Sequence, residues 1–459
     1  MIYSGIVTYE GEDIAFLFDE LKLSLYPTNE IFDKITMRKI ENTLCYTYEK
    51  KPISNGCLEG KVNGQSLYIH FYFDPIGYGT SIKNGVECEI TIYVQKFTKY
   101  NFEISFPVQN VSLRFESQQI HKFLGLIPKY EISQDMSKDL CGTIKCSTET
   151  TKYVSRGIID GAEISITPAY RCNWSETSFD FFPQLLISIS LIKDEKHLLS
   201  MYDAIKKFIK YAFMRMDIEP GSFLIKIENN MSGEICSINN IKDANEKEDC
   251  NDIFRGFIPW KILYKHAIDI LGKIYLNDWY LDNLPRNKIE RTAISDITIS
   301  KDAAAFENEF SKCFPQGLPT HSEKRIVAEN EVEKEILPLY ESAQGKKRKI
   351  YKGFISHIRN DALADKIEYC LNENEKCIEW VKTKIADELS YEEIADKCVS
   401  VRNDIDHGNK KINKDDDIVK AYIILRGLIY AMQLKRMGYE TEEINASVKC
   451  LYFIKGFAP

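Results

Sequence analysis

Apolar and polar residues alternate with a period of two over much of residues 1–192. This alternation is typical of β-strands that bury one face. Two dipeptides that favour tight hairpin turns, Asn63-Gly64 and Asp160-Gly161, stand between such runs. Many short strands separated by turn signals predict an antiparallel sandwich or barrel-like domain. The clearest runs are residues 90–94, 102–108, 111–115 and 185–191.

The period changes to that of a helix from Leu198 onwards. Apolar residues recur every three or four positions up to Phe213, with lysines between them, which predicts an amphipathic helix. This helix opens a mixed connector over residues 196–289. The other elements expected in the connector are a strand at 223–227, a surface loop at 239–252 and a helix over 259–284 that ends before Pro285.

The spacing of apolar residues in the rest of the chain, residues 290–459, is helical almost throughout. Ser300 is expected to cap a helix that contains the run Ala303–Glu307. A second helix is expected over 323–340, which Pro338 should end or kink. The segments expected to follow are a basic loop at 345–349 and helices at about 350–372 and 375–388.

A capping box marks the start of the next helix. In Ser390-Tyr391-Glu392-Glu393, the serine and the glutamate three residues later can satisfy each other's exposed amides. Gly408 is a natural stop for this helix. The run Asp415-Asp416-Asp417 suits the positive N-terminus of a last long helix, which is expected to reach Gly438.

These patterns predict an α+β protein with an N-terminal antiparallel β-rich domain over 1–195 and a C-terminal all-α helical bundle over 290–459. The composition agrees with a folded globular protein of several domains, because 44% of the 459 residues are hydrophobic and 28% are charged. The aromatic content of 12% argues against disorder.

The chain carries no signal for a membrane or for export. No apolar run approaches the roughly 18 residues that a membrane-spanning helix needs, and the N-terminus lacks the regions of a signal peptide. We therefore expect a cytoplasmic protein. Its 13 cysteines are expected to be reduced, because their number is odd and no Cys-x-x-Cys pair occurs. No metal-ligand spacing, phosphate-binding loop or dinucleotide fingerprint is present, so no cofactor is expected.

The net charge of −8 differs from that of a protein that coats nucleic acid. An enzyme that cleaves RNA needs only local positive charge around its site. Two local clusters could supply it, with a solvated surface as the alternative for each. They are Lys346, Lys347, Arg348 and Lys349 in the first cluster and Lys410 and Lys411 in the second.

The second cluster follows a candidate catalytic motif, Arg402-Asn403-Asp404-Ile405-Asp406-His407. An imidazole moves a proton at neutral pH, and a guanidinium stabilises charge that builds up on a phosphate. This pair is a working set for cleaving RNA without metal. Asn403 is expected to orient His407 or the phosphate.

The spacing alone leaves a structural alternative open. Five residues of an ideal helix correspond to about 140° of rotation, so Arg402 and His407 would lie on different faces. They converge if the helix loosens near His407 or if two subunits share the site. In the structural alternative, a carboxylate such as Glu307 or Glu309 pairs with Arg402, and His407 binds a carbonyl at the helix end.

A long helical C-terminal domain with Arg402, Asn403 and His407 near its last helices resembles the HEPN superfamily. Many HEPN domains are metal-independent ribonucleases with Arg-x(4–6)-His and a polar residue after the arginine. The Ala303–Glu307 run is similar to the first HEPN helix, whose acidic residue often joins the site. The resemblance carries Glu307 over to this role, with Glu309 as an equal candidate by sequence.

The layout of a β-rich domain followed by such a bundle resembles the ApeA family of bacterial phage-defence proteins. The resemblance implies an endoribonuclease that acts in abortive infection and leaves a 2′,3′-cyclic phosphate. It also implies an RNA substrate, a homodimer with two facing motifs, and a phage-derived trigger bound by the β-rich domain. The competing class is a non-catalytic HEPN-like module for RNA binding or dimerisation.

Overall fold

The chain divides into two compact units. Unit 1 comprises Met1–Lys206, Ile218–Ile253 and Leu263–Tyr275, and unit 2 comprises Lys207–Asp217, Phe254–Ile262 and Leu276–Pro459. The computed structural model describes residues 2–19, 21–42, 45–50, 52–54, 56–83, 87–126, 129–134, 142–147, 152–174, 179–219, 223–227, 232–237, 256–287, 289–291, 293–319, 323–358, 361–406 and 415–452.

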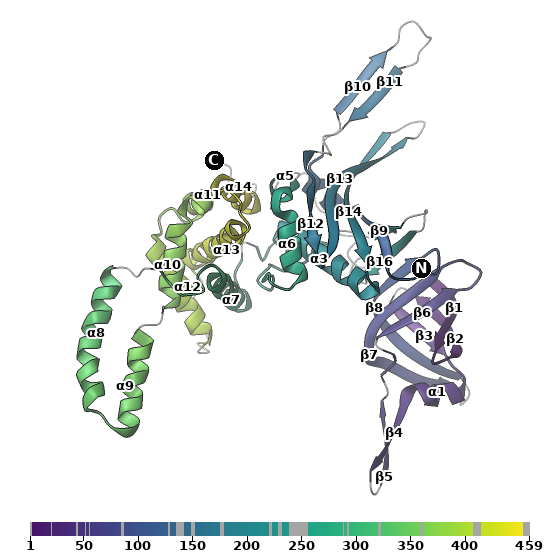
Figure 1. Cartoon of the computed structure of the whole chain (residues 1–459), viewed down its shortest axis with the longest axis horizontal. Helices are drawn as coiled ribbons and strands as arrows, with labels where there is room; N and C mark the ends of the chain where they lie inside the picture. Colours follow the sequence, from purple (N-terminus) through teal and green to yellow (C-terminus); the bar gives the residue numbers. More distant parts are fainter. Residues whose placement is uncertain are drawn as a thin grey trace. The chain divides into compact units, whose positions relative to one another are not determined.

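Unit 1 is built on a 12-stranded antiparallel sheet (Figure 1). Its order is β12-β13-β14-β9-β15-β16-β8-β3-β2-β1-β6-β7, and β7 also pairs with β8. This extra pairing closes one half of the sheet into a barrel, which removes its free edges. The barrel strands are β1 (Ile2–Tyr9), β2 (Glu12–Asp19), β3 (Lys22–Tyr26), β6 (Cys57–Val62), β7 (Tyr68–Lys83) and β8 (Glu87–Tyr100).

Aromatic rings fill the barrel. Phe18 makes edge-to-face contacts with Phe71 and Phe97, with ring centroids 5.0 Å apart in both pairs. Phe16 meets Phe71 in the same manner at 5.4 Å. Such pairs add roughly 0.5–1.5 kcal/mol each to the burial of their area. The alternating pattern of these strands thus buries one face, and the expected antiparallel β-rich domain is confirmed.

The other half of the sheet is an open wing. Its strands are β9 (Val108–Phe115), β12 (Ser155–Ile159), β13 (Ala162–Trp174), β14 (Phe179–Ile192), β15 (Phe223–Lys226) and β16 (Ser232–Ser237). Helix α6 (Ala267–Tyr275) packs on one face of β12 and β13. A side chain at Gly157 would collide with Ile268 of α6, because its Cβ would lie 2.7 Å from a methyl carbon.

Smaller elements complete unit 1. They are α1 (Asn29–Thr36), α2 (Gln118–Leu124), and the two-stranded sheets β4 (Met37–Asn42) with β5 (Cys45–Lys50) and β10 (Lys129–Gln134) with β11 (Gly142–Ser147). Helix α3 (Glu195–Phe213) confirms the amphipathic helix expected from Leu198, and its residues are divided between the two units.

Both predicted hairpin turns occur. Asp160 and Gly161 have φ values of 50° and 79° between the paired residues Ile159 and Ala162. Two consecutive positive φ values match the twist of a two-residue hairpin. The loop that contains Asn63-Gly64 is longer. It is closed by Val62 and Leu67, where the Val62 amide donates to the Leu67 carbonyl at 2.9 Å.

Two expectations for this region are wrong. Residues 102–107 form no strand although they alternate, because β8 ends at Tyr100 and Pro107 has no amide hydrogen to donate to a ladder. Helix α6 ends at Tyr275, well before Pro285, and turns follow it.

The strand expected at 223–227 occurs as β15, but it belongs to the large sheet of unit 1. The loop expected at 239–252 lies outside the described residues.

Unit 2 is a helical bundle around α13 (Asp416–Arg436). Every residue of α13 from Ala421 to Leu434 is buried, as expected for a helix that is apolar on all sides. The neighbours of α13 are α7 (Asp296–Cys313), α10 (Leu363–Glu373), α11 (Glu375–Ile385), α12 (Tyr391–Asp406) and α14 (Thr441–Tyr452). Among the helices that the structure describes, none is both long and apolar enough to cross a membrane.

The N-terminal caps of three helices can be compared with the capping residues expected from the sequence. The box at Ser390 and Glu393 is confirmed, with the Glu393 amide 3.2 Å from Ser390 Oγ and the Ser390 amide 2.7 Å from Glu393 Oε2. Asp415 caps α13 as expected. The expected cap at Ser300 is wrong, since α7 begins one turn earlier, where Ser295 and Thr298 form the box.

A helical hairpin separates α7 from α10 in the chain. It consists of α8 (Glu323–Ser342) and α9 (Gly345–Ile358), which pack on each other (Figure 1). The basic loop expected at 345–349 is therefore wrong: lysine and arginine are good helix formers, and the run forms the first turn of α9. Of the two effects expected of Pro338, an end of the helix does not occur, because α8 continues through Pro338 to Ser342.

Candidate active site

Two residues of the candidate site come together across two helices. Arg402, near the end of α12, forms an ion pair with Glu307 in the middle of α7, at 3.8 Å between Nη2 and Oε2. The side chains remain 33% and 44% exposed, respectively. An ion pair this long and this exposed contributes at most about 1 kcal/mol. The Arg402 side chain is thus partly exposed at the surface of the bundle, where a phosphate could reach it.

The helix that carries Arg402 is anchored from behind by α13. Tyr422 of α13 is buried and donates a hydrogen bond of 2.8 Å to the Cys398 carbonyl of α12. Burial raises the pKa of Tyr422, and the positive charge of Arg402 opposes that rise. Tyr422 therefore remains a neutral hydrogen-bond donor at neutral pH, and it fixes α12 one turn before Arg402.

The neighbouring glutamate has a different role. Glu309 is fully buried and pairs with Arg436 of α13, with Oε1 2.6 Å from Nε and Oε2 3.2 Å from Nη2. This two-point contact ties α7 to the end of α13. Of the two carboxylates that the sequence offered as equals, Glu307 is the one that faces Arg402.

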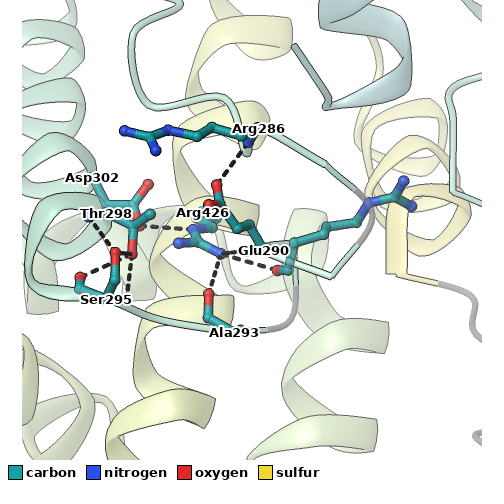
Figure 2. A network of polar contacts seen from close by, with 8 residues as sticks. Arg286, Glu290, Ala293, Ser295, Thr298, Asp302 and Arg426 are labelled. Carbon is teal, nitrogen blue, oxygen red and sulfur yellow. Dashed lines mark hydrogen bonds and ion pairs between the residues drawn. The ribbon is translucent and has the colours of Figure 1, made fainter. Parts of the chain in front are cut away.

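A fully buried ion pair holds the start of α7 (Figure 2). Arg426 of α13 donates from Nε to Asp302 Oδ2 at 2.7 Å, and neither side chain is exposed to solvent. Its Nη1 also donates to the carbonyls of Glu290 and Arg291 at 3.0 Å and of Ala293 at 3.4 Å. One guanidinium thus fixes the segment that leads into α7 and the helix itself.

Burial raises the pKa of the Asp302 carboxyl to about 6, although the charge and hydrogen bond of Arg426 act in the opposite direction. The guanidinium of Arg426, at 2.7 Å, favours the ionised form of Asp302, so the two side chains form a buried ion pair. An unpaired charge at this depth would cost several kcal/mol. The pair is therefore a structural requirement of the bundle, five residues before Glu307.

The other predicted site residues are not brought to this pair by the described structure. Asn403 is exposed on α12, and the next residue on a helix points about 100° away from its neighbour. His407, Lys410 and Lys411 lie outside the described residues, as does Gly408.

The cations expected to bind RNA on α9 are exposed. Arg348 stacks on the Tyr340 ring of α8, with its guanidinium carbon 5.0 Å from the ring centre. Within the described chain, the side chains of Lys346, Lys347 and Lys349 form no ion pair or hydrogen bond, and all three are exposed to solvent. No group of three or more histidine, cysteine, aspartate or glutamate side chains in the described residues could hold a metal ion.

Comparison with known protein families decides the class of this bundle. Residues 307–443 match the family model described as Apea-like HEPN. The C-terminal bundle therefore contains an Apea-like HEPN domain, which confirms the resemblance drawn from Arg402, Asn403 and His407. The matched segment begins at Glu307 and includes the whole motif. Neither curated proteins nor solved structures gave a match to the chain.

Sequence reasoning missed the Arg426–Asp302 pair. One signal was available, because Arg426 interrupts the apolar run from Tyr422 to Leu434, and an arginine inside a buried helix needs a buried partner. The partner itself lies 124 residues away in the chain and follows only from the packing of α7 on α13.

We expect the two glutamates to respond differently to replacement by alanine. Glu309→Ala leaves Arg436 without its carboxylate and should lower the free energy of unfolding by about 3 kcal/mol. Glu307→Ala should change it by no more than about 1 kcal/mol, because the side chain is exposed and its ion pair is weak. Urea unfolding of both variants measures the difference. Equal losses of stability in the two variants would contradict the separation of roles.

Proposed function

We propose that this protein is a metal-independent endoribonuclease of the HEPN type that acts in bacterial defence against phage. An HEPN domain indicates an RNase-type or nucleotide-related defence module. The observation that carries the finer proposal is the pair of Arg402 with Glu307 inside the matched region, in which the Arg402 side chain is 33% exposed. A phosphate can reach a guanidinium with this exposure from solvent.

The proposed reaction is an intramolecular transfer. The 2′-oxygen of one ribose attacks the adjacent phosphorus and loses its proton to a base, and the bond from phosphorus to the 5′-oxygen breaks. The leaving oxygen takes up a proton, which gives a 2′,3′-cyclic phosphate and a 5′-hydroxyl. His407 moves the proton, Arg402 neutralises the charge on the phosphoryl oxygens, and Asn403 orients His407 or the phosphate.

The reaction needs a base and an acid at the same time, and one motif supplies a single histidine. Two copies of the chain with facing motifs would supply both. We therefore propose a homodimer in which His407 of each copy contributes to one shared site. Glu307 fits a supporting role, because a carboxylate at 3.8 Å holds the charge of Arg402 in place until the more negative phosphate replaces it.

RNA is proposed to bind through exposed cations. Lys346, Lys347, Arg348 and Lys349 extend from the first turn of α9, and Lys410 and Lys411 follow the motif in sequence. Contacts with phosphates of this kind give sequence-independent affinity that falls as salt increases. Cleavage should therefore depend on salt even though the whole chain is acidic.

Unit 1 is proposed to sense the infection. A ribonuclease in a bacterial cell must be inactive until it is needed, and a ligand that prefers one of two dimer arrangements is sufficient to switch it. A phage-derived molecule bound by the β-rich unit is the proposed trigger. The alternative is a non-catalytic module in which Arg402 is a structural residue, and the 3.8 Å pair with Glu307 contributes at most about 1 kcal/mol to such a role.

Cleavage of RNA is expected to persist in excess EDTA. The proposed mechanism uses only a proton carrier and a guanidinium, so removal of divalent ions should change the rate by less than about twofold. The measurement is the rate of product formation by the full-length protein with and without chelator, and detection of a cyclic phosphate end identifies the reaction. A rate that vanishes with EDTA and returns with magnesium or manganese would contradict the proposal.

A further inference from the structure

A second polar site lies on the open wing of the sheet in unit 1. Strands β9, β12, β13 and β14 line a cavity of about 660 Å³, a size within the usual range for small-molecule sites. Its lining is partly polar and partly apolar, and the more exposed side chains come from the face opposite to the buried residues of these strands. The residues that matter here are Arg156, Ile158, Glu163, Ser165, Ser188 and Ser112.

The strand register arranges these side chains in a row. Arg156 pairs with Ser165, Ser165 with Ser188, and Ser188 with Ser112. Ser112 pairs in turn with Lys226 of β15. Directly opposed side chains in an antiparallel sheet lie about 5 Å apart on the same face. Three neighbouring hydroxyl groups are therefore flanked by an arginine and a lysine.

The cations of this face are not used by the fold. Within the part of the chain that the structure describes, Arg156, Arg114 and Lys226 form no ion pair and no side-chain hydrogen bond. Arg114 follows Ser112 by two residues, so it lies on the same face of β9. Hydroxyl and guanidinium donors that converge on one cavity are the usual partners of phosphate oxygens.

A second row of side chains, beside the first, pairs the apolar Ile158 with the acidic Glu163. The backbone amide of Glu163 donates to Ser190 Oγ at 2.9 Å. The Glu163 carboxylate is exposed and lines the cavity, where it can accept hydrogen bonds. Ile158 is 70% exposed although it is an apolar residue of strand β12. An acceptor and an exposed apolar side chain suit the sugar hydroxyls and the flat base of a nucleotide.

We propose that this cavity binds a nucleotide, with the phosphate on Arg156 and the serine row and the nucleoside against Glu163 and Ile158. The site lies wholly within unit 1, and the proposal goes beyond the ribonuclease reaction. Its test is direct binding, so its failure would leave the proposed catalysis intact, and failure of catalysis would leave this site intact.

The experiment is calorimetric titration of the full-length protein with AMP, GMP, CMP and UMP, and with the matching nucleosides. At least one nucleotide should bind, and its nucleoside should bind about tenfold more weakly or worse. Arg156→Ala should weaken the binding of that nucleotide by about tenfold, equivalent to about 1.4 kcal/mol. Ser188→Val should also weaken it, since valine keeps the strand and removes the hydroxyl.

Lys196→Ala is the matched control, because Lys196 is an exposed cation on α3 of the same unit. This variant should bind the nucleotide within about twofold of the parent protein. The proposal is overturned if no nucleotide binds at millimolar concentration, if inorganic phosphate binds as tightly as the nucleotide, or if Arg156→Ala binds unchanged. Binding of an RNA oligonucleotide that mononucleotides do not displace from this face would overturn it as well.

Discussion

Replacement of His407 by alanine is expected to lower the rate of RNA cleavage by about 10²–10⁴-fold, the usual effect of losing a positioned proton carrier. The stability of the protein should not change, because α12 is held by Tyr422 and by the Ser390 capping box, and neither involves His407. Single-turnover cleavage of a labelled RNA measures the rate, and thermal unfolding measures the stability.

A matched control separates the role of His407 from a general effect of losing an imidazole. His266 is a partly exposed histidine of unit 1, and its Nδ1 lies 3.3 Å from Asp269 Oδ2. His266→Ala should cleave RNA at the parental rate. If His407→Ala cleaves normally, or if both variants lose activity equally, His407 is not the proton carrier.

Replacement of Asp302 by alanine is expected to lower the free energy of unfolding of the helical unit by about 3–5 kcal/mol. The variant leaves Arg426 charged, fully buried and without its carboxylate. Urea unfolding followed by tryptophan fluorescence is a suitable measurement. Of the four tryptophans, Trp260, Trp279 and Trp380 belong to unit 2, so the signal reports mainly on the bundle.

Two comparisons make this result specific. Glu388→Ala removes one of the three carboxylate partners of Lys420 at the surface and should cost no more than about 1 kcal/mol. The double variant Asp302→Leu with Arg426→Met should recover part of the lost stability, because no charge remains buried. A loss of less than about 1 kcal/mol in Asp302→Ala would show that the pair does not hold the bundle together.

Local sequence signals predicted those elements whose conformation is determined locally. The Asp160-Gly161 turn follows from two residues that tolerate positive φ, and the start of α12 follows from a serine and a glutamate three residues apart. The same reasoning was wrong at residues 102–107, where the alternation is present but no partner strand pairs. It was also wrong at 345–349, where charge indicated a loop but the residues favour a helix.

The candidate sites also contain some residues that the sequence identified and others that only the fold brings together. Arg402 and Glu307 could be named from a motif and a helix, but the preference for Glu307 over Glu309 depends on Arg436, which lies 127 residues from Glu309. The serine row was beyond sequence reasoning for a similar reason. Ser112, Ser165 and Ser188 are unremarkable within their own strands, and only the register of three strands makes them neighbours.

The burial of α13 on all sides also determines how this bundle can open. A helix at the edge of a domain can fray while the rest stays folded, and its amide hydrogens then exchange with solvent through small local openings. Helix α13 has no such route between Ala421 and Leu434, because every one of these side chains is covered. Its amides can exchange only when the surrounding helices separate, so their exchange rate reports the global stability of the unit to which the Arg402 motif belongs.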